Sequence, residues 1–268
     1  LGCSSYMIEP YERDAVNNGM QGLLLKNELP LTVCDMRTEE ALGDIAASMR
    51  ARGAQLRLGP GYLDDLEGFD YIFRTPGLLP TDPALVAAKA RGAVITSEME
   101  IFFQLCPCRT IGITGSDGKT TTSSIIAELL KAAGRRVHLG GNIGKPLLCE
   151  IPDFHPDDIA VLELSSFQLH SINIRPNVAV ITNVSPNHLD KHPDFDDYVN
   201  AKRQIFANQT ADDVLIVNRD NACTARFGEE AKSKVLYFSR KETLSDGVFC
   251  RNGMIYRSHN YEVESIIP

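Results

Sequence analysis

The stretch that most constrains how this chain can fold is residues 110–122, Thr-Ile-Gly-Ile-Thr-Gly-Ser-Asp-Gly-Lys-Thr-Thr-Thr. An apolar run leads into a glycine-rich turn, and a helix-like segment follows, which gives the order strand, loop and helix. Glycines let backbone N–H groups turn towards phosphate oxygens, and a helix N-terminus favours an anion. The stretch therefore predicts a phosphate-binding loop for a nucleoside triphosphate.

The glycine spacing of this loop departs from the usual pattern, in which four residues precede Gly-Lys. Gly115 is followed by two residues before Gly118, and Gly112 by five. An ordinary strand–helix turn is the alternative interpretation. In the nucleotide interpretation, Lys119 reaches the β- and γ-phosphates and the Thr120 hydroxyl binds Mg²⁺. The expected ATP-binding residues are Gly115, Ser116, Asp117, Gly118, Lys119, Thr120 and Thr121.

Composition and charge limit the class of protein. A length of 268 residues suggests one large or two modest domains, and 43% hydrophobic with 23% charged residues is typical of a globular chain with a real core. The net charge of −8 argues against nucleic-acid binding, although it leaves anionic ligands open. No apolar run approaches the length that a membrane requires, so no membrane insertion is expected. Seven irregularly spaced cysteines are typical of reduced thiols and favour a cytoplasmic location.

The first part of the chain alternates between strand-like and helix-like segments. We expect strands at 31–35, 55–58, 71–74 and 93–95, and helices at 39–51 and 83–90. Residues 1–5 read either as the end of a glycine-rich turn or as a terminus without structure. This alternation favours a parallel sheet with helices on both faces, and a domain boundary is expected after Thr96.

Polar residues in this part follow strand ends, where open α/β sheets bind ligands. Asp35 ends the first strand and could hold a ribose or base, with Arg37 beside it; alternatively, Asp35 caps the helix at 39–51. Thr75, Pro76 and Gly77 form a turn after another strand.

The second part continues with strands at 136–139, 159–164, 178–181 and 213–217, and then shorter strands at 235–238, 247–249 and 254–256. Glu163, near a strand tip beside the phosphate loop, suits a Mg²⁺ ligand; a helix-capping or salt-bridged acid is the alternative. His188 has Asn187 and Asp190 beside it, which favours a functional role, whereas His192 is expected at the surface. A lysine on a helix is usually solvated, so the pattern alone does not single out Lys202 on the helix at 195–207.

Four segments in one order resemble the Mur ligase family. They are the phosphate loop, Gly-Gly-Asn-Ile-Gly at 140–144, Glu-Leu-Ser-Ser-Phe-Gln-Leu at 163–169 and Asn-Val-Ser-Pro-Asn-His-Leu-Asp at 183–190. The short phosphate loop is that family's own variant. The segment at 163–168 is the most discriminating and resembles the members that add D-glutamate. The resemblance is strong over residues 93–221, moderate over 31–77 and poor before Asn27.

The resemblance implies an α/β fold with a Rossmann-like UDP-binding domain at 1–96 and a P-loop ATP-binding central domain, truncated, at 97–268; the family's C-terminal domain would be absent. It implies an ATP- and Mg²⁺-dependent ligase that adds D-glutamate to UDP-N-acetylmuramoyl-L-alanine through an acyl phosphate, as a cytoplasmic monomer in peptidoglycan precursor synthesis. Because the third domain closes over ATP in this family, the chain itself could turn over or only bind ligands. A sister Mur ligase, a folylpolyglutamate synthase-like ligase and a nucleotide-binding fragment are the alternatives.

The resemblance also assigns roles to single residues. Asp35 and Arg37 would contact the uridine end of the substrate, and Thr75, Pro76 and Gly77 its diphosphate. The muramoyl-alanine channel would be lined by Asn142, Ser165, Gln168 and His188. The expected catalytic residues are Lys119, Glu163, His188 and Lys202; the expected metal ligands are Thr120 and Glu163 for one Mg²⁺, and His188 and a carbamylated Lys202 for another. Met36 departs from the family pattern. A short hydroxyl residue at this position would offer a hydrogen bond to the nucleotide, which a methionine side chain does not.

Overall fold

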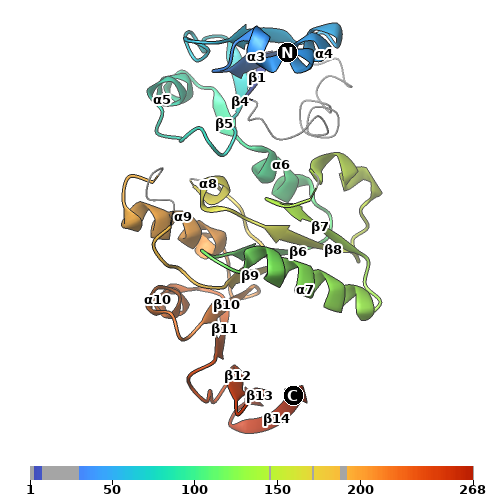
Figure 1. Cartoon of the computed structure of the whole chain (residues 1–268), viewed down its shortest axis with the longest axis vertical. Helices are drawn as coiled ribbons and strands as arrows, with labels where there is room; N and C mark the ends of the chain where they lie inside the picture. The colour runs from blue at the N-terminus through green and yellow to red at the C-terminus, as the bar shows by residue number, and fades with distance from the viewer. Residues whose placement is uncertain (1–2, 8–29, 145, 171, 188–191, 268) are drawn as a thin grey trace. The chain divides into compact units, whose positions relative to one another are not determined.

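The computed structural model describes residues 3–7, 30–144, 146–170, 172–187 and 192–267 (Figure 1). The chain divides into two compact units. Unit 1 comprises Leu1–Cys106, Gly144–Phe154 and His170–Ile172, and unit 2 comprises Pro107–Ile143, His155–Leu169 and Asn173–Pro268. Residues 97–106, which the sequence analysis placed with the second domain, thus group with unit 1. His188 lies outside the described residues.

Unit 1 contains a five-stranded parallel sheet in the order β3-β2-β1-β4-β5. The strands are β1 Cys3–Met7, β2 Leu31–Asp35, β3 Gln55–Leu58, β4 Phe69–Phe73 and β5 Val94–Thr96. For residues 3–5 both expectations are wrong, because Cys3–Met7 forms the central strand and pairs with β2 and β4; residues 1 and 2 lie outside the described residues. The local sequence Cys-Ser-Ser-Tyr-Met has no apolar run; its two neighbouring strands supply the hydrogen bonds that define it.

The helices among the described residues of unit 1 are α3 Glu39–Leu42, α4 Asp44–Ala51, α5 Pro83–Ala90, α6 Glu98–Leu105 and the 3₁₀ turn η1 Leu148–Asp153. The single helix expected at 39–51 is interrupted at Gly43, whose φ of 52° is left-handed. Thr38 caps α3 by accepting a hydrogen bond from the Ala41 N–H at 3.3 Å. The alternative role of Asp35 as the cap of this helix is therefore wrong. The core beneath α5 joins Leu66, Phe69, Ile72, Leu78, Leu85 and Ala88.

Unit 2 contains a nine-stranded sheet in the order β14-β13-β12-β11-β10-β9-β6-β8-β7. Its strands are β6 Arg109–Thr114, β7 Val137–Gly141, β8 Ile159–Glu163, β9 Val178–Ile181, β10 Val214–Asn218, β11 Lys234–Ser239, β12 Gly247–Arg251, β13 Met254–His259 and β14 Glu262–Ile267. The strands from β7 to β12 pair in parallel, and β13 and β14 are antiparallel. The expected hairpin turns through Asn252 and Gly253, with φ values of 54° and 77°. The sequence analysis missed β14.

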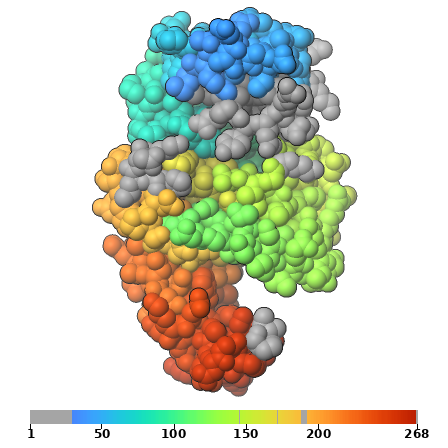
Figure 2. All heavy atoms as spheres, in the orientation of Figure 1, coloured from blue at the N-terminus to red at the C-terminus, as the bar shows by residue number. Residues whose placement is uncertain are grey.

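Four helices of unit 2 are α7 Lys119–Ala132, α8 Ser166–Leu169, α9 Phe195–Ala207 and α10 Ala222–Glu230. α7 lies along the sheet in front of β6, β7 and β8 (Figure 1), and its Ala127 is buried against Ile113, Val161 and Val180. Its opposite side is at the molecular surface (green in Figure 2), where Ile125 and Leu129 are exposed. In the described part of the chain, none of the helices has the length and apolar character needed to cross a bilayer.

The parallel register brings the site residues to one edge of the unit 2 sheet. Glu163, at the end of β8, is opposite Ile113 of β6 on one side and opposite Gly141 of β7 on the other. Because the carboxyl ends of parallel strands share an edge, the phosphate loop after β6 and the glycine-rich turn after β7 meet at Glu163.

Candidate functional site

The phosphate loop connects β6 to α7 through two glycines with positive φ. Gly115 has a φ of 152°, and a Cβ atom there would collide with the Thr182 hydroxyl. Gly118 has a φ of 78° and directly precedes the first residue of α7, Lys119. Gly112 is different, because it lies in β6 and a Cβ there would be 3.3 Å from the Ile205 Cδ1 atom. The loop conformation thus depends on the two glycines that the short spacing brings close together.

The end of β9 holds the loop in place. Asn183 accepts the Ser116 N–H at its backbone carbonyl (2.9 Å) and the Asp117 N–H at its side-chain oxygen (3.1 Å). The Thr182 hydroxyl donates to the Asp117 carbonyl at 2.7 Å. Because these two loop N–H groups are engaged, the first turn of α7, whose N–H groups have no intrahelical partners, is the remaining backbone surface for an anion. Sequence reasoning missed both anchoring residues.

Glu163 is buried, with 2% of its surface exposed, and its carboxylate receives hydrogen bonds from both sides. The Thr120 hydroxyl donates to Oε2 at 2.7 Å, and the Asn142 amide donates to Oε1 at 3.1 Å. The Asn142 N–H also donates to the Glu163 carbonyl at 2.8 Å. This arrangement joins Thr120 and Glu163, which the sequence analysis expected at one Mg²⁺, with Asn142, which it expected along the acceptor channel. The capping and salt-bridge alternatives for Glu163 have no counterpart among its described contacts.

Two lysine side chains converge on one carbonyl oxygen of the loop. Lys119 Nζ donates to the Gly115 and Ser116 carbonyls, at 3.0 Å each. Lys202 Nζ donates to the same Gly115 carbonyl at 2.8 Å, although α9 supplies it from much later in the chain. The Lys119 ammonium beside a helix N-terminus makes a cationic position suited to phosphate oxygens, and the Lys202 amine lies next to it.

Lys202 is fully buried, with 1% of its surface exposed. Burial, followed by the charge of Lys119, lowers the pKa of the Lys202 amine from 10.5 to about 7, against the opposing effect of Asp117. The expectation that a helical lysine is solvated is therefore wrong for this residue. Its apolar neighbours on α9, such as Tyr198, Ala201 and Ile205, were the available signal, because they occupy the same helix face.

A family model of the Mur ligase middle domain matches residues 113–265, which include the loop, Glu163 and Lys202. The chain belongs to the Mur ligase family. Two similar curated proteins are the UDP-N-acetylmuramoylalanine–D-glutamate ligases of Clostridium novyi and Acetivibrio thermocellus. The first is 49% identical over 84% of this chain and 49% of its own length, and the second is 48% identical over 87% and 50%. The chain thus spans about half the length of the curated relatives it matches.

Solved structures of other Mur ligases share the fold. The UDP-N-acetylmuramate:L-alanyl-γ-D-glutamyl-meso-diaminopimelate ligase of Neisseria meningitides superposes with a TM-score of 0.56 at 15% identity, over 98% of this chain and 86% of that one. A UDP-N-acetylmuramoyl-L-alanyl-D-glutamate–2,6-diaminopimelate ligase gives 0.51 at 20% identity, over 76% and 54%. At these identities the similarity establishes the α/β fold of the Mur ligases.

Two further expected residues of this Mur ligase in unit 2 are Ser165, which precedes α8, and Gln168, which lies on it. The Ser165 N–H and hydroxyl both donate to the Gln168 side-chain oxygen, at 2.9 and 3.0 Å. The pair thereby fixes the turn that leads from β8 into α8. Their expected contact with the acceptor substrate stays a prediction.

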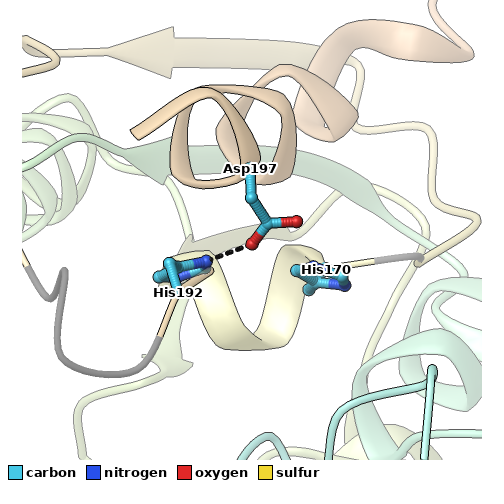
Figure 3. A group of neighbouring side chains, drawn as sticks. All are labelled: His170, His192 and Asp197. Carbon is cyan, nitrogen blue, oxygen red and sulfur yellow. Dashed lines mark hydrogen bonds and ion pairs between the residues drawn. The ribbon is translucent and has the colours of Figure 1, made fainter. Parts of the chain in front are cut away.

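His192 is not at the surface, and that prediction is wrong. The residue is 3% exposed, and its Nδ1 atom lies 2.6 Å from the Asp197 carboxylate on the first turn of α9 (Figure 3). Its Nε2 atom lies 3.0 Å from the Ser166 hydroxyl. Asp197 was the signal that sequence reasoning passed over, since a histidine followed by an acid at a helix start has a local partner.

In unit 1 of the Mur ligase chain, the expected residues lie at the carboxyl ends of β2 and β4, with β1 between these strands. Asp35 is 2% exposed, and its carboxylate accepts from Arg37 Nε at 3.0 Å and from Arg37 Nη2 at 2.7 Å. Thr75 is buried, and its hydroxyl has no hydrogen-bond partner among the described residues. Pro76 and Gly77 follow it and are exposed.

Proposed function

We propose that this chain is the nucleotide- and acceptor-binding part of a Mur ligase that joins D-glutamate to UDP-N-acetylmuramoyl-L-alanine at the expense of ATP. The observation that carries the proposal is the 49% identity to a D-glutamate ligase along 84% of the chain. The convergence of Lys119, Lys202 and the Glu163–Thr120 pair beside a phosphate loop supports it. Because the chain spans about half of such relatives, the activity and the substrates of the whole protein are part of the proposal.

The residues beside the loop fit a magnesium ion. Mg²⁺ prefers oxygen ligands, and the Thr120 hydroxyl and the buried Glu163 carboxylate present their oxygens 2.7 Å apart at the start of α7. We assign these two residues to the ion that accompanies ATP; when bound, it neutralises charge on the phosphates. Lys119 would exchange its two loop carbonyls for phosphate oxygens.

Lys202 as an amine offers no oxygen to a metal ion, so we propose that the amine is carbamylated. With its pKa lowered to about 7, a large fraction of the amine is neutral near neutral pH. The neutral nitrogen attacks carbon dioxide, forms a C–N bond and loses a proton, which leaves an anionic carbamate with two oxygen atoms. His188 is the second proposed ligand at this position.

The reaction proposed for the site joins two anions before it forms the amide. The terminal carboxylate of the acceptor attacks the γ-phosphate, ADP leaves, and the amine of D-glutamate then displaces phosphate from the acyl phosphate. Lys119 and the first turn of α7 would hold the transferring phosphoryl group and balance its charge. The reaction needs no protein nucleophile, so none of the cysteines is assigned a role.

Unit 1 would bind the UDP part of the acceptor. The buried Thr75 hydroxyl, which has no partner in the described part of the chain, suits a diphosphate oxygen as acceptor, because a buried hydroxyl without a partner costs free energy that a ligand would recover. Asp35, oriented by Arg37, would contact the uridine. Asn142, Ser165, Gln168 and His188 complete the proposed acceptor path.

Calorimetric titration of the 268-residue chain tests this proposal. We expect UDP-N-acetylmuramoyl-L-alanine to bind at least about tenfold more tightly than UDP-N-acetylmuramate, which lacks the alanine carboxylate, and we expect Mg·ATP to bind independently. Equal binding of both acceptors would favour a sister ligase, and binding of Mg·ATP alone would favour a nucleotide-binding fragment. Carbon-13 NMR with labelled bicarbonate tests the carbamate, with Lys202→Ala as the control that should lack its resonance.

A further inference from the structure

A column of side chains runs from α8 to the phosphate loop within unit 2. The Phe167 ring stacks on the His192 imidazole with centroids 4.9 Å apart, and that imidazole meets the Tyr198 ring edge-on at 5.2 Å. Lys202 Nζ lies 4.5 Å from the centroid of the Tyr198 ring and continues to the Gly115 carbonyl at 2.8 Å. His192 is thus linked to Lys202 through one intervening ring.

Hydrogen bonds fix His192 at both ring nitrogens. Nδ1 is 2.6 Å from the Asp197 carboxylate, and Nε2 is 3.0 Å from the Ser166 hydroxyl (Figure 3 shows the first of these). A neutral imidazole with its proton on Nδ1 satisfies both bonds, since it donates to Asp197 and accepts from Ser166. His192 and Ser166 are each 3% exposed, so the bond between them is shielded from water, whereas the Asp197 side chain is 26% exposed.

The same three residue types form the triad of many hydrolases, but this Ser166 cannot serve as such a nucleophile. Ser166 is 3% exposed and its hydroxyl is bonded to His192 Nε2 in the interior of unit 2, where a substrate carbonyl would have no access. The contacts of His192 instead fit a structural role. Ser166 and Phe167 belong to α8, Asp197 and Tyr198 to α9, and His192 precedes α9, so the imidazole connects two helices that carry different parts of the proposed site.

The two helices place different groups. α8 follows Ser165 and carries Gln168, which are assigned above to the acceptor. α9 carries Lys202, which reaches the phosphate loop, and Tyr198, whose hydroxyl lies 3.0 Å from the Ser116 hydroxyl. A change in the spacing of α8 and α9 would therefore change the distance between the acceptor and phosphate groups.

We propose that His192 is a positioning residue: by bonding to Ser166 and Asp197 and packing between Phe167 and Tyr198, it holds the Lys202 amine in place relative to the acceptor residues on α8. This inference rests on the proposed function for the roles of Lys202 and Ser165. It concerns the placement of the Lys202 side chain, which can be measured separately from any ligase activity.

The test compares three variants of the 268-residue chain. His192→Phe keeps an aromatic ring but removes both hydrogen bonds. His192→Asn keeps a donor for Asp197, because its amide nitrogen takes the place of Nδ1. His138→Phe is the matched control: His138 bonds to Asp158 at 2.8 Å with its side chain 12% exposed, on β7 of the same unit, and Asp158 precedes β8 whereas Glu163 ends it.

Trace acetylation with acetic anhydride, read by mass spectrometry, reports how accessible the Lys202 amine is relative to Lys131, which is exposed at the end of α7. In His192→Phe we expect the ratio to rise about fivefold or more, because the lost bonds involve a charged carboxylate and hold the column together. His192→Asn should show a smaller rise, and His138→Phe should match the wild type. The carbamate resonance of Lys202 should fall by a similar factor in His192→Phe only.

An unchanged acetylation ratio in both His192 variants, or an equal rise in His138→Phe, would overturn the inference, because it would show that Lys202 keeps its place without the imidazole or responds to any loss of stability. If His192→Phe does not fold, the ratio in His192→Asn decides the question against the same control. Absence of a carbamate resonance in the wild-type chain would count against the proposed role of Lys202, while the acetylation ratio would still decide whether His192 positions it.

Discussion

Gly115 is the residue of the phosphate loop with the least tolerance for a side chain. With a φ of 152° and the Thr182 hydroxyl in the path of a Cβ atom, Gly115→Ala must displace the loop. We expect the variant to lose about 2 kcal/mol of unfolding free energy and at least tenfold in Mg·ATP affinity. Urea unfolding and calorimetric titration measure the two effects.

Gly118→Ala is the control for this prediction. Gly118 also has a positive φ, of 78°, but apart from its chain neighbours and its own helix no described residue comes within 4 Å of the position of its Cβ. The substitution should therefore cost only the left-handed backbone strain, about 1 kcal/mol. Equal losses in both variants would mean that the contact with Thr182 is not what requires glycine at 115.

Lys202 predicts a specific pH dependence of stability. Its amine has a pKa of about 7 in the folded chain and 10.5 when unfolded, so between these values the unfolded chain binds more protons. The free energy of unfolding should then rise with pH from about 7 upward, by at most about 1.4 kcal/mol per pH unit. Below pH 7 the full cost of the buried charge is present.

The measurement is urea unfolding in carbon dioxide-free buffer from pH 6 to 10, for the wild type and Lys202→Met. The difference between the two curves isolates Lys202, because other groups that titrate in this range are common to both. The free energy of unfolding of the wild type should rise relative to that of Lys202→Met as the pH increases. Parallel curves would show that the amine is not desolvated as the structure places it.

At single residues, sequence reasoning was limited because it does not show contacts between different elements of the fold. Lys119, Thr120 and Glu163 were predicted for one phosphate and metal site because each lies next to a glycine-rich turn or a strand end, whereas Asn142 was predicted only for the acceptor channel. The pattern alone did not single out Lys202 and placed His192 at the surface, because their partners come from other elements: the Gly115 carbonyl belongs to the phosphate loop after β6, and Ser166 belongs to α8. The hydrophobic pattern of a helix identifies its buried face, but it does not identify the residues that this face contacts.

At the scale of elements, the N-cap residue of α10, Asn221, also bonds to a neighbouring segment of the chain. The Asn221 oxygen accepts from the Thr224 N–H at 3.1 Å, and its amide donates to the Val184 carbonyl at 3.0 Å, which ties α10 to the segment after β9. We expect Asn221→Ala to cost about 2 kcal/mol of unfolding free energy, since it removes a cap and leaves a carbonyl without its partner.

Asp194→Ala, at the cap of α9 in the same unit, is the comparison. The Asp194 side chain accepts from the Asp197 N–H at 2.8 Å and makes no other described hydrogen bond, so its removal should cost about 1 kcal/mol. Thermal or urea unfolding gives both values. A cost for Asn221→Ala no larger than that for Asp194→Ala would mean that the bond to Val184 contributes nothing to stability.

Elements with their own boundary signals were predicted correctly. Pro83 and Asp82 begin α5, Asp194 begins α9, and the apolar run of β9 is bounded by polar residues, and these three elements have the predicted limits. Elements defined by their neighbours were not. β1 is short and polar, and β14 was missed because its strand pairing with β13 is set by the hairpin partner.

At the scale of the whole molecule, unit 1 is assembled from three separate stretches of the chain. The second stretch contains η1 and Phe154, whose ring meets Phe102 of α6 at 6.1 Å. A shortened chain that begins at Pro107 keeps Leu148 and Phe154 but loses their partners in unit 1. We expect it to melt at a lower temperature than the whole chain, by about 2–4 °C for each kcal/mol lost, and to bind a hydrophobic dye.

Calorimetry and dye fluorescence of the two chains test this expectation. If the shortened chain melts at the temperature of unit 2 in the whole chain and binds no dye, residues 144–154 are held by unit 2 without help from unit 1. The sequence analysis did not foresee this arrangement, because a boundary drawn after Thr96 assumes that each domain is one continuous segment. The monomeric state, the cytoplasmic location and that boundary stay predictions.

The discontinuous make-up of unit 1 has a consequence for how the chain folds during synthesis on the ribosome. A domain built from one continuous segment can fold as soon as that segment has emerged. Unit 1 cannot be completed in this way, because it also uses Gly144–Phe154 and His170–Ile172. Its last residues emerge only after β6, α7, β7 and β8 of unit 2. Unit 1 therefore completes its folding after part of unit 2 has already been synthesised. Contacts between residues that are distant in sequence then limit the folding rate of unit 1.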